Sequence, residues 1–522
     1  MHEIDLLFVL LAAMTLLIGI ADRLQIPYPI LLTLGGLGIS LIPGLPLIEL
    51  DPDVVFLIFL PPILTAAAFF MPLRDFRANL RAIGLLAIGL VTFTTTLVAL
   101  VARALLPDLS WAAAFTLGAI VSPPDAIAAT SIARQLRLPQ RLVVIMEGES
   151  LVNDASALVF YRIAITAALT GSFSLLDAGR EFVVTSVGGV LTGLVLAWLV
   201  GQMLKRLNNT PVELVLTFLG SFFAYLIAER LHVSGVLSAV ALGLYVGYIS
   251  PRAMPPATRV QAEAIWNIVV FLLNGLAFIL IGLQLPTIVR DVGRADLGQL
   301  VIAAAAIALT CIVARLIWVF PGTYLPRYLS KTVRLRNPQA PSWRSVLVLG
   351  WAGMRGIVSL AAALSLPREF PNREAILFIT FCVILATLVG QGLTLPALIR
   401  RLGVRGDDGH EEENRARLVV ASAGLARLDE LASEEWTRDA HLDDLRHHYI
   451  EQRDRFAARF DMHTAEEPFE HTADAFLRLR DELLRAEQQA LIELRDTDTI
   501  NDEVLRTVQR ELDLERLRLG LG

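Results

Sequence analysis

The stretch EGESLVNDA, residues 147–155, is followed directly by the apolar stretch SALVFYRIAITAAL, residues 156–169. Three carboxylates, Glu147, Glu149 and Asp154, therefore open a segment that otherwise has the composition of a membrane-spanning helix. A charge at the centre of a bilayer costs at least about 2.5–3.5 kcal/mol, so such residues are rare there unless they have a function. The stretch predicts a membrane protein with a polar site inside its membrane part.

The composition of the whole chain also indicates a membrane protein. Of its 522 residues, 55% are hydrophobic and 18% are charged, and the mean hydropathy is +0.59. A soluble protein carries roughly 25% charged residues, which argues against an apolar soluble enzyme. Both cysteines, Cys311 and Cys382, lie in apolar runs, so neither a disulfide framework nor a cysteine-based metal site is indicated.

Apolar runs between charged or Pro/Gly-rich breaks predict thirteen transmembrane helices, since roughly 20 apolar residues span a bilayer. The segments should all be helical, because a chain in lipid must satisfy its own backbone hydrogen bonds. The predicted spans are 4–21, 28–43, 53–71, 83–103, 110–133, 142–168, 182–204, 212–230, 233–249, 265–284, 298–320, 344–366 and 374–399.

Basic residues predict the orientation of these spans. Loops after odd-numbered spans are rich in arginine, as at 74–81 and 134–141, whereas loops after even-numbered spans are poor in it. The positive-inside rule then places the N-terminus outside and the C-terminus in the cytoplasm. Arginine-rich, lysine-poor usage fits a bacterial inner membrane.

The composition changes sharply after about residue 404, which predicts a transmembrane domain at 1–404 and a cytoplasmic helical domain at 405–522. Leu425, Leu428 and Leu431 recur there at helical spacing. Six of the eight histidines lie in this region, including His447 and His448. We interpret them as solvated surface residues, with pH sensing or metal binding as the alternative.

The first of two interrupted spans is AIVSPPDAIAAT, residues 119–130. Proline removes a backbone donor and clashes with the preceding turn, so the helix should break near Pro123 and Pro124. Unpaired backbone groups at membrane depth are tolerated where they line a cavity or bind an ion. Asp125, next to the break, therefore favours a site over a simple proline kink.

The second interrupted span is LGWAGMRGIVSLAAAL, residues 349–364, which contains Gly353, Arg355 and Gly356. An arginine at this depth needs an anionic partner, and we expect Glu149 to be that partner. Two other buried arginines, Arg162 and Arg315, are interpreted as snorkelling or packing partners.

The polar stretch itself offers oxygen ligands. On a helix, Glu149 and Asn153 share a face, and Ser150 and Asp154 share the next one. Hard oxygen ligands are those that an alkali cation prefers, so Asp154 and Ser150 could bind Na⁺. A single carboxylate can hold a cation or a proton but not both at once, and that competition is sufficient for exchange.

The two interrupted spans also resemble each other. LSWAAAFTLGAIVSPPDAIAATSIARQLRLP, residues 109–139, parallels PSWRSVLVLGWAGMRGIVSLAAALSLP, residues 341–367. They belong to predicted spans five and twelve, which run in opposite directions through the membrane. Inverted repeats with paired broken helices are typical of secondary transporters.

Together SPPDA, EGESLVNDA, GMRG and FLPPILTAAAFF (59–70) resemble the NhaP/NHE-type sodium/proton exchangers of the first cation:proton antiporter family. The resemblance covers roughly residues 5–400. It implies an all-helical fold of about thirteen spans with inverted repeats and two crossing broken helices, and a homodimer. It assigns cation and proton binding to Asp154, orientation of the site to Asn153, a cation ligand to Ser150, the crossing to Asp125, and a structural ion bridge to Glu149 and Arg355.

The chain departs from the family pattern in two places. Members often carry an acidic residue a few positions after the LPP of span three, where this chain has Thr65, Ala66 and Ala67, so one ligand is absent or is supplied by Thr65. Many members have a threonine where this chain has Pro124. Both departures bear on ion selectivity.

The sequence thus predicts a secondary antiporter that exchanges Na⁺, Li⁺ or K⁺ for H⁺, one for one, because a single aspartate lies beside the neutral Asn153. The core bundle, spans 3–6 and 11–13, would move against the remaining spans. Potassium/proton exchange by the same fold is the main alternative, and a cation channel is a weaker one. The membrane part has no HExxH or Gly-x-Ser-x-Gly motif, which argues against a membrane-embedded hydrolase, so we expect no enzyme. We also expect no cofactor and no nucleic-acid partner.

Overall fold

The computed structural model describes residues 3–24, 26–42, 51–292, 297–329, 341–406, 410–432, 442–461 and 483–490, together with Val508, Leu512, Leu514 and Glu515. Every regular element in this part of the chain is a helix, which confirms the all-α prediction. The chain divides into two compact units, Met1–Gly406 and Asp407–Gly522, and each is described by itself.

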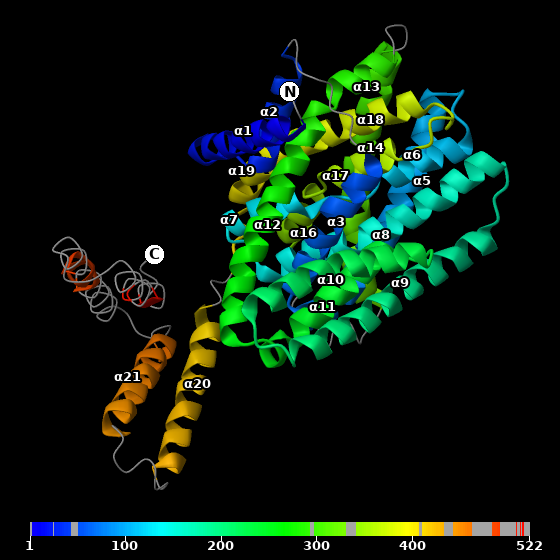
Figure 1. Cartoon of the computed structure of the whole chain (residues 1–522). Coiled ribbons are helices and arrows are strands. Elements are labelled where there is room, and N and C mark those ends of the chain that lie inside the picture. The colour runs from blue at the N-terminus through cyan, green and yellow to red at the C-terminus, as the bar shows by residue number, and fades with distance from the viewer. Residues whose placement is uncertain are drawn as a thin grey trace. The chain divides into compact units, whose positions relative to one another are not determined.

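The first unit is a bundle of long helices (Figure 1). Two of them contain a π-helical stretch, because α4, η1 and α5 are continuous, as are α18, η2 and α19. The elements are α1 (Glu3–Leu24), α2 (Tyr28–Ser40), α3 (Pro52–Phe69), α4 (Leu73–Gly84), η1 (Leu85–Leu90), α5 (Val91–Leu105), α6 (Trp111–Val121), α7 (Ala126–Gln135), α8 (Gln140–Thr170), α9 (Leu175–Leu204), α10 (Thr210–Arg230), α11 (Gly235–Ala253), α12 (Pro256–Leu283), α13 (Leu285–Val292), α14 (Leu297–Leu329), α16 (Trp343–Trp351), α17 (Ile357–Leu364), α18 (Arg373–Leu385), η2 (Ala386–Gln391) and α19 (Gly392–Leu402).

Nine helical segments in the described residues are long and apolar enough to cross a membrane. Two further apolar helices, Tyr28–Ser40 and Val54–Phe69, are shorter. A described helix lies in each of the predicted ranges, but the number thirteen stays a prediction.

Helix α8, which carries the EGESLVNDA stretch, lies in the middle of one group of helices. It packs against α4, α6 and α7, while α5 and α18 pack against α14. In a second group α11 packs against α9, α10 and α3. Helix α2 packs closely on α12 because each helix places a glycine against the backbone of the other. A Cβ at Gly36 of α2 would lie 2.2 Å from the carbonyl oxygen of Ile279, and a Cβ at Gly282 of α12 would lie 2.2 Å from the carbonyl oxygen of Thr33.

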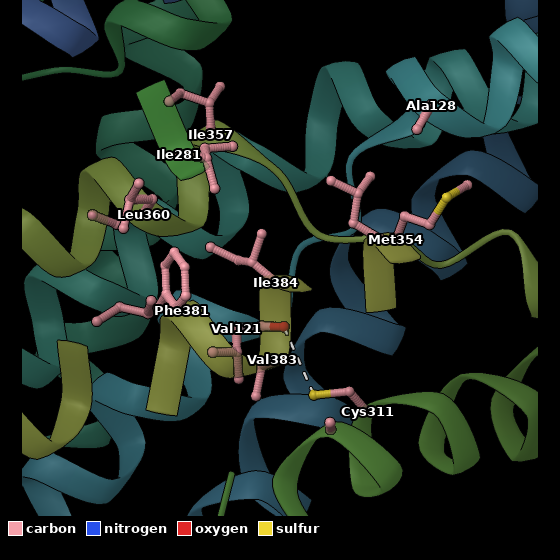
Figure 2. Packing of buried hydrophobic residues seen from close by; sticks show 14 of the residues in the cluster. Val121, Ala128, Ile281, Cys311, Met354, Ile357, Leu360, Phe381, Val383 and Ile384 are labelled. Carbon is pink, nitrogen blue, oxygen red and sulfur yellow. Dashed lines mark hydrogen bonds between the residues drawn. The ribbon is translucent and has the colours of Figure 1, made fainter. Parts of the chain in front are cut away.

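Buried apolar side chains surround the two interrupted helices (Figure 2). Val121 ends α6, Met354 lies between α16 and α17, and both are fully buried in the same cluster as Phe381 and Ile384 of α18. This packing holds the irregular backbone in one place, away from lipid.

The second unit contains α20 (His410–Leu431) and α21 (Leu442–Asp461), which pack as a helical pair. Gly424 faces Tyr449, and Arg446 forms an ion pair with Asp429 at 2.6 Å. His447 is exposed on α21, and the side chain of His448 lies outside the described residues. The assignment of 405–522 to the cytoplasm stays a prediction.

Candidate functional site

The two interrupted helices touch at their breaks. Helix α6 ends at Val121 and α7 begins at Ala126, while α16 ends at Trp351 and α17 begins at Ile357. The backbone N–H of Asp125 donates to the Met354 carbonyl at 2.7 Å. The first break holds Pro123 and Pro124, and the second holds Gly353 and Gly356.

Close approach at the crossing depends on Gly356. A Cβ placed there would lie 1.7 Å from Oδ2 of Asp125, which is far inside van der Waals contact. The second break therefore needs a residue without a side chain at this position.

Side chains from neighbouring helices satisfy the carbonyls freed at the first break. Arg355 donates from Nε to the Val121 carbonyl at 2.8 Å, and the Cys311 thiol lies 3.9 Å from the same oxygen (Figure 2). Asn153 donates from Nδ2 to the Pro124 carbonyl at 2.8 Å. An unpaired buried carbonyl costs about 1–3 kcal/mol, so these donors stabilise the break.

The second break is satisfied in the same way. Arg315 donates from Nε to the Leu349 carbonyl at 3.2 Å, and Gln391 donates to the Trp351 carbonyl at 2.9 Å. Arg355 also donates to the carbonyl of Gly353. The C-terminal ends of α6 and α16 carry partial negative charge, and each receives a guanidinium group.

Asp125, by contrast, lies at the N-terminal end of a helix, where the partial charge is positive. It is the N-cap of α7, and its Oδ1 accepts from the Ile127 N–H at 2.8 Å. The hydroxyl of Ser150 lies 3.4 Å from the Ala126 N–H, from which it accepts a hydrogen bond. A carboxylate is favoured here by the capping bond and by the positive end of the helix dipole.

The expected bridge between Glu149 and Arg355 is wrong. Glu149 pairs with Arg315 through two hydrogen bonds, at 2.5 and 2.8 Å, and both side chains are only 2% exposed. Arg355 is instead held by the carbonyls of the two breaks, which need a donor at that position.

The interpretation of Arg315 as a snorkelling or packing residue is therefore also wrong. Arg315 lies near the middle of the 33-residue α14, too far from either end to reach water. That position was a signal in the sequence that it needs a buried anion. Arg162, by contrast, pairs with Glu229 at 2.6 Å in a half-exposed place.

A cavity of about 760 Å³ reaches the crossing. Asp154 is 6% exposed, and it lines the cavity together with Asp125 and Ser150. Asn153 lies behind them, where its Oδ1 is buried without a hydrogen-bond partner among the described residues.

The cavity also brings in residues that the sequence reasoning did not single out, namely Tyr28, Thr130, Asn267 and Asn274. Asn274 could have been noticed as an amide within an apolar run. Thr65 is not among the lining residues and donates to the Ala239 carbonyl at 3.3 Å, whereas Ala66 and Ala67 do line the cavity. In this structure Thr65 does not replace the absent acid.

The cavity extends to one end of the bundle. Phe70, Arg134, Gln140 and Glu263 line it near the ends of α3, α7, α8 and α12. Glu147, also on the lining, pairs with Arg134 at 2.6 Å. The helix ends at this mouth adjoin the arginine-rich loops.

The chain matches known proteins over most of its length. The model of the transmembrane sodium/hydrogen exchanger family matches residues 9–401. An uncharacterised Na⁺/H⁺ exchanger of Mycobacterium tuberculosis is 34% identical, over 98% of this chain and 95% of its own. A sodium, potassium, lithium and rubidium/H⁺ antiporter of Bacillus subtilis is 34% identical over 76% of this chain and 61% of its own.

A solved structure has a similar fold. The sodium proton antiporter MjNhaP1 of Methanocaldococcus jannaschii gives a TM-score of 0.60 at 21% identity, covering 76% of this chain and 98% of its own. The helical fold, its two touching interruptions and these matches agree, and the chain belongs to the sodium/hydrogen exchanger family.

Proposed function

We propose that the chain is a secondary antiporter in which Asp154 binds alternately a monovalent cation and a proton. The observation that carries this proposal is the state of Asp154 itself. Its carboxylate lies at the inner part of the cavity, and it forms neither an ion pair nor a side-chain hydrogen bond with a described residue. Glu149, by contrast, is neutralised by Arg315.

The buried charges support an exchange of one cation for one proton. Around the crossing, three carboxylates (Asp125, Glu149 and Asp154) face two guanidinium groups (Arg315 and Arg355), which stay protonated. One negative charge is left, and a single Na⁺ or a single proton balances it. An uncompensated charge in this environment would be costly.

Oxygen atoms are available to coordinate the cation. Asp154, Asp125 and Ser150 line the cavity, and Asn153 orients the first break through Pro124. We expect Na⁺ at Asp154 and Ser150, because alkali cations prefer such ligands. The Bacillus relative, named for four cations, favours potassium/proton exchange as the second candidate.

The open end of the cavity indicates which side of the membrane the site faces. The loops at this end carry the arginines that the positive-inside rule assigns to the cytoplasm. The site therefore faces inward in this conformation, in an inner-membrane protein with its N-terminus outside and its C-terminal domain in the cytoplasm. A homodimer is proposed from the family alone.

The proposal is tested by cation-driven dissipation of a pH gradient in everted vesicles or proteoliposomes, with Na⁺, Li⁺ and K⁺ in turn. We expect Asp154→Asn to abolish the response at matched expression. Asp177→Asn, at an exposed position in the first turn of α9, is the matched control and should transport normally. Transport by Asp154→Asn at the wild-type rate would overturn the assignment, and a silent wild type would be retested without residues 405–522.

The stoichiometry has its own test. Asn153→Asp would add a second unpaired carboxylate, so that one cation would exchange for two protons. Exchange by the wild type should not respond to an imposed membrane potential, whereas exchange by the variant should accelerate or slow with its sign. A wild type that responds to the potential would refute the one-for-one exchange.

A further inference from the structure

A second cavity, of about 210 Å³, lies apart from the transport site. It is enclosed by α4 with η1, α8, α14 and α16, near the arginine-rich loops. Its polar lining residues are Asn79, Arg81, Arg141, Thr323, Arg327 and Ser345. Its apolar side is formed by residues that lie further into the same helices, namely Leu85, Leu86, Leu142, Ile145, Val319, Val346 and Leu349.

The polar lining residues of this cavity include basic groups. Three arginines line it, and none of the described lining residues is acidic. Arg141 and Arg327 line the same cavity, where their like charges repel each other. Arg81 makes no ion pair within the described part of the chain. Arg141 donates from Nε to Oδ1 of Asn79 at 3.1 Å, which leaves its terminal nitrogens available.

Two helix N-termini add to this positive field. The lining includes the first turns of α8 and α16, at Pro139 and Arg141 and at Pro341 and Ser345. The N-cap of α8 is Pro139, whose side chain cannot accept from the first N–H groups of the helix. At α8 the uncapped N–H groups and the helix dipole favour an anion, whereas at α16, where Ser342 caps the Ser345 N–H, the helix dipole alone contributes. Charge and hydrogen-bond donors thus both favour an anionic ligand.

We propose that this cavity binds the phosphate of an anionic phospholipid. Arginines and helix N-termini are the groups that recognise phosphate. The apolar side of the cavity distinguishes a lipid from a free phosphate, because it can accept the start of an acyl chain while the headgroup meets the arginines. Basic pockets between transmembrane helices at the cytoplasmic side are suited to such headgroups.

The bound lipid would stabilise the part of the bundle that holds the transport site. Ile145 precedes Glu149 by about one turn of α8, and Leu349 is the residue whose carbonyl accepts from Arg315. A ligand between α8 and α16 therefore braces the helices that carry Asp154 and the second break.

The test uses the purified full-length protein in non-ionic detergent, with mixed micelles of phosphatidylglycerol or of phosphatidylcholine. The apparent melting temperature is measured against lipid concentration, because a ligand of the folded state raises it. We expect phosphatidylglycerol to raise the melting temperature and phosphatidylcholine to have little effect. In Arg81→Gln/Arg141→Gln the half-maximal lipid concentration should rise at least about tenfold, which corresponds to about 1.4 kcal/mol, because charge-assisted hydrogen bonds to the phosphate are lost.

The matched control is Lys205→Gln/Arg206→Gln, which removes two charges from another exposed basic loop of the same end. It should keep the wild-type response, and equal losses in both variants would overturn the proposal. If the glutamine variant does not fold, Arg81→Lys/Arg141→Lys replaces it, and an unchanged response there would also count against the site. An equal effect of inorganic phosphate or glycerol 3-phosphate would overturn the lipid assignment.

Discussion

The two interrupted helices begin alike and differ at their centres. Ser110 caps α6 by accepting from the Ala113 N–H at 3.2 Å, and Ser342 caps α16 by accepting from the Ser345 N–H at 3.1 Å. A tryptophan follows each serine. The first break then contains prolines and the second contains glycines, so a helix is interrupted in both halves by different residues.

The difference separates two tasks. The first break presents a carboxylate to the cavity, whereas the second presents an arginine to carbonyls. Asp125 lies beside the N-terminal ends of both α7 and α17, through its bond to Ile127 and its approach to Gly356. The proline break thus supplies the polar site, and the glycine break lets the two halves come close enough to form it.

Among the variants that test the two breaks, removal of the buried carboxylate of Glu149 should have the largest effect on stability. Glu149→Gln leaves Arg315 charged and unpaired next to the second break, which costs about 3–5 kcal/mol. We expect a strong drop in melting temperature and little folded protein. A double-mutant cycle in purified protein should show strong coupling of Glu149 with Arg315. Equal or stronger coupling with Arg355 would restore the bridge that this structure rejects.

A side chain at the crossing should have the next largest effect. Gly356→Ala places a methyl group on Asp125, and overpacking of a tight contact costs about 1–3 kcal/mol. Because the crossing is part of the site, exchange should fall below detection while the protein remains in the membrane. Gly38→Ala is the control, since a Cβ there meets nothing within 4 Å. Normal exchange by Gly356→Ala would mean that the breaks can separate without loss of function.

The sequence predicted the two breaks better than the contacts between them. Paired prolines predict irregular backbone at Pro123, and a Gly-rich stretch predicts it at Gly353, because proline and glycine each alter the backbone at their own position. The partner of Glu149 depends on which of two arginines reaches it from different helices. Residue spacing within one helix does not contain that information, and Arg315 lies 166 positions further along the chain than Glu149.

The same limit explains Asn274 and Thr65. Asn274 lies on α12 and lines the same cavity as Asp125. The sequence pattern does not reveal how α12 is aligned against α3 and α17, which it contacts. Thr65 has a suitable hydroxyl, but it faces the Ala239 carbonyl of α11. Helix faces can be read from one sequence, while the neighbour of each face is decided by packing of the whole bundle.

The serine caps should have the smallest effect, and they test how alike the two halves are. Loss of an N-cap hydroxyl costs about 1 kcal/mol. Ser110→Ala and Ser342→Ala should therefore lower the melting temperature of the purified protein by similar amounts, and the double variant should show the sum, because distant sites act independently. Exchange should persist in all three, since neither serine lines the cavity. The hydroxyls of Ser342 and Ser345 also form a hydrogen bond with each other at 2.8 Å. If Ser342→Ala lowers the melting temperature more than Ser110→Ala does, we attribute the difference to this additional bond and not to a weaker cap at Ser110. Ser345→Ala separates the two contributions, because it removes the hydroxyl but keeps the backbone N–H that Ser342 caps.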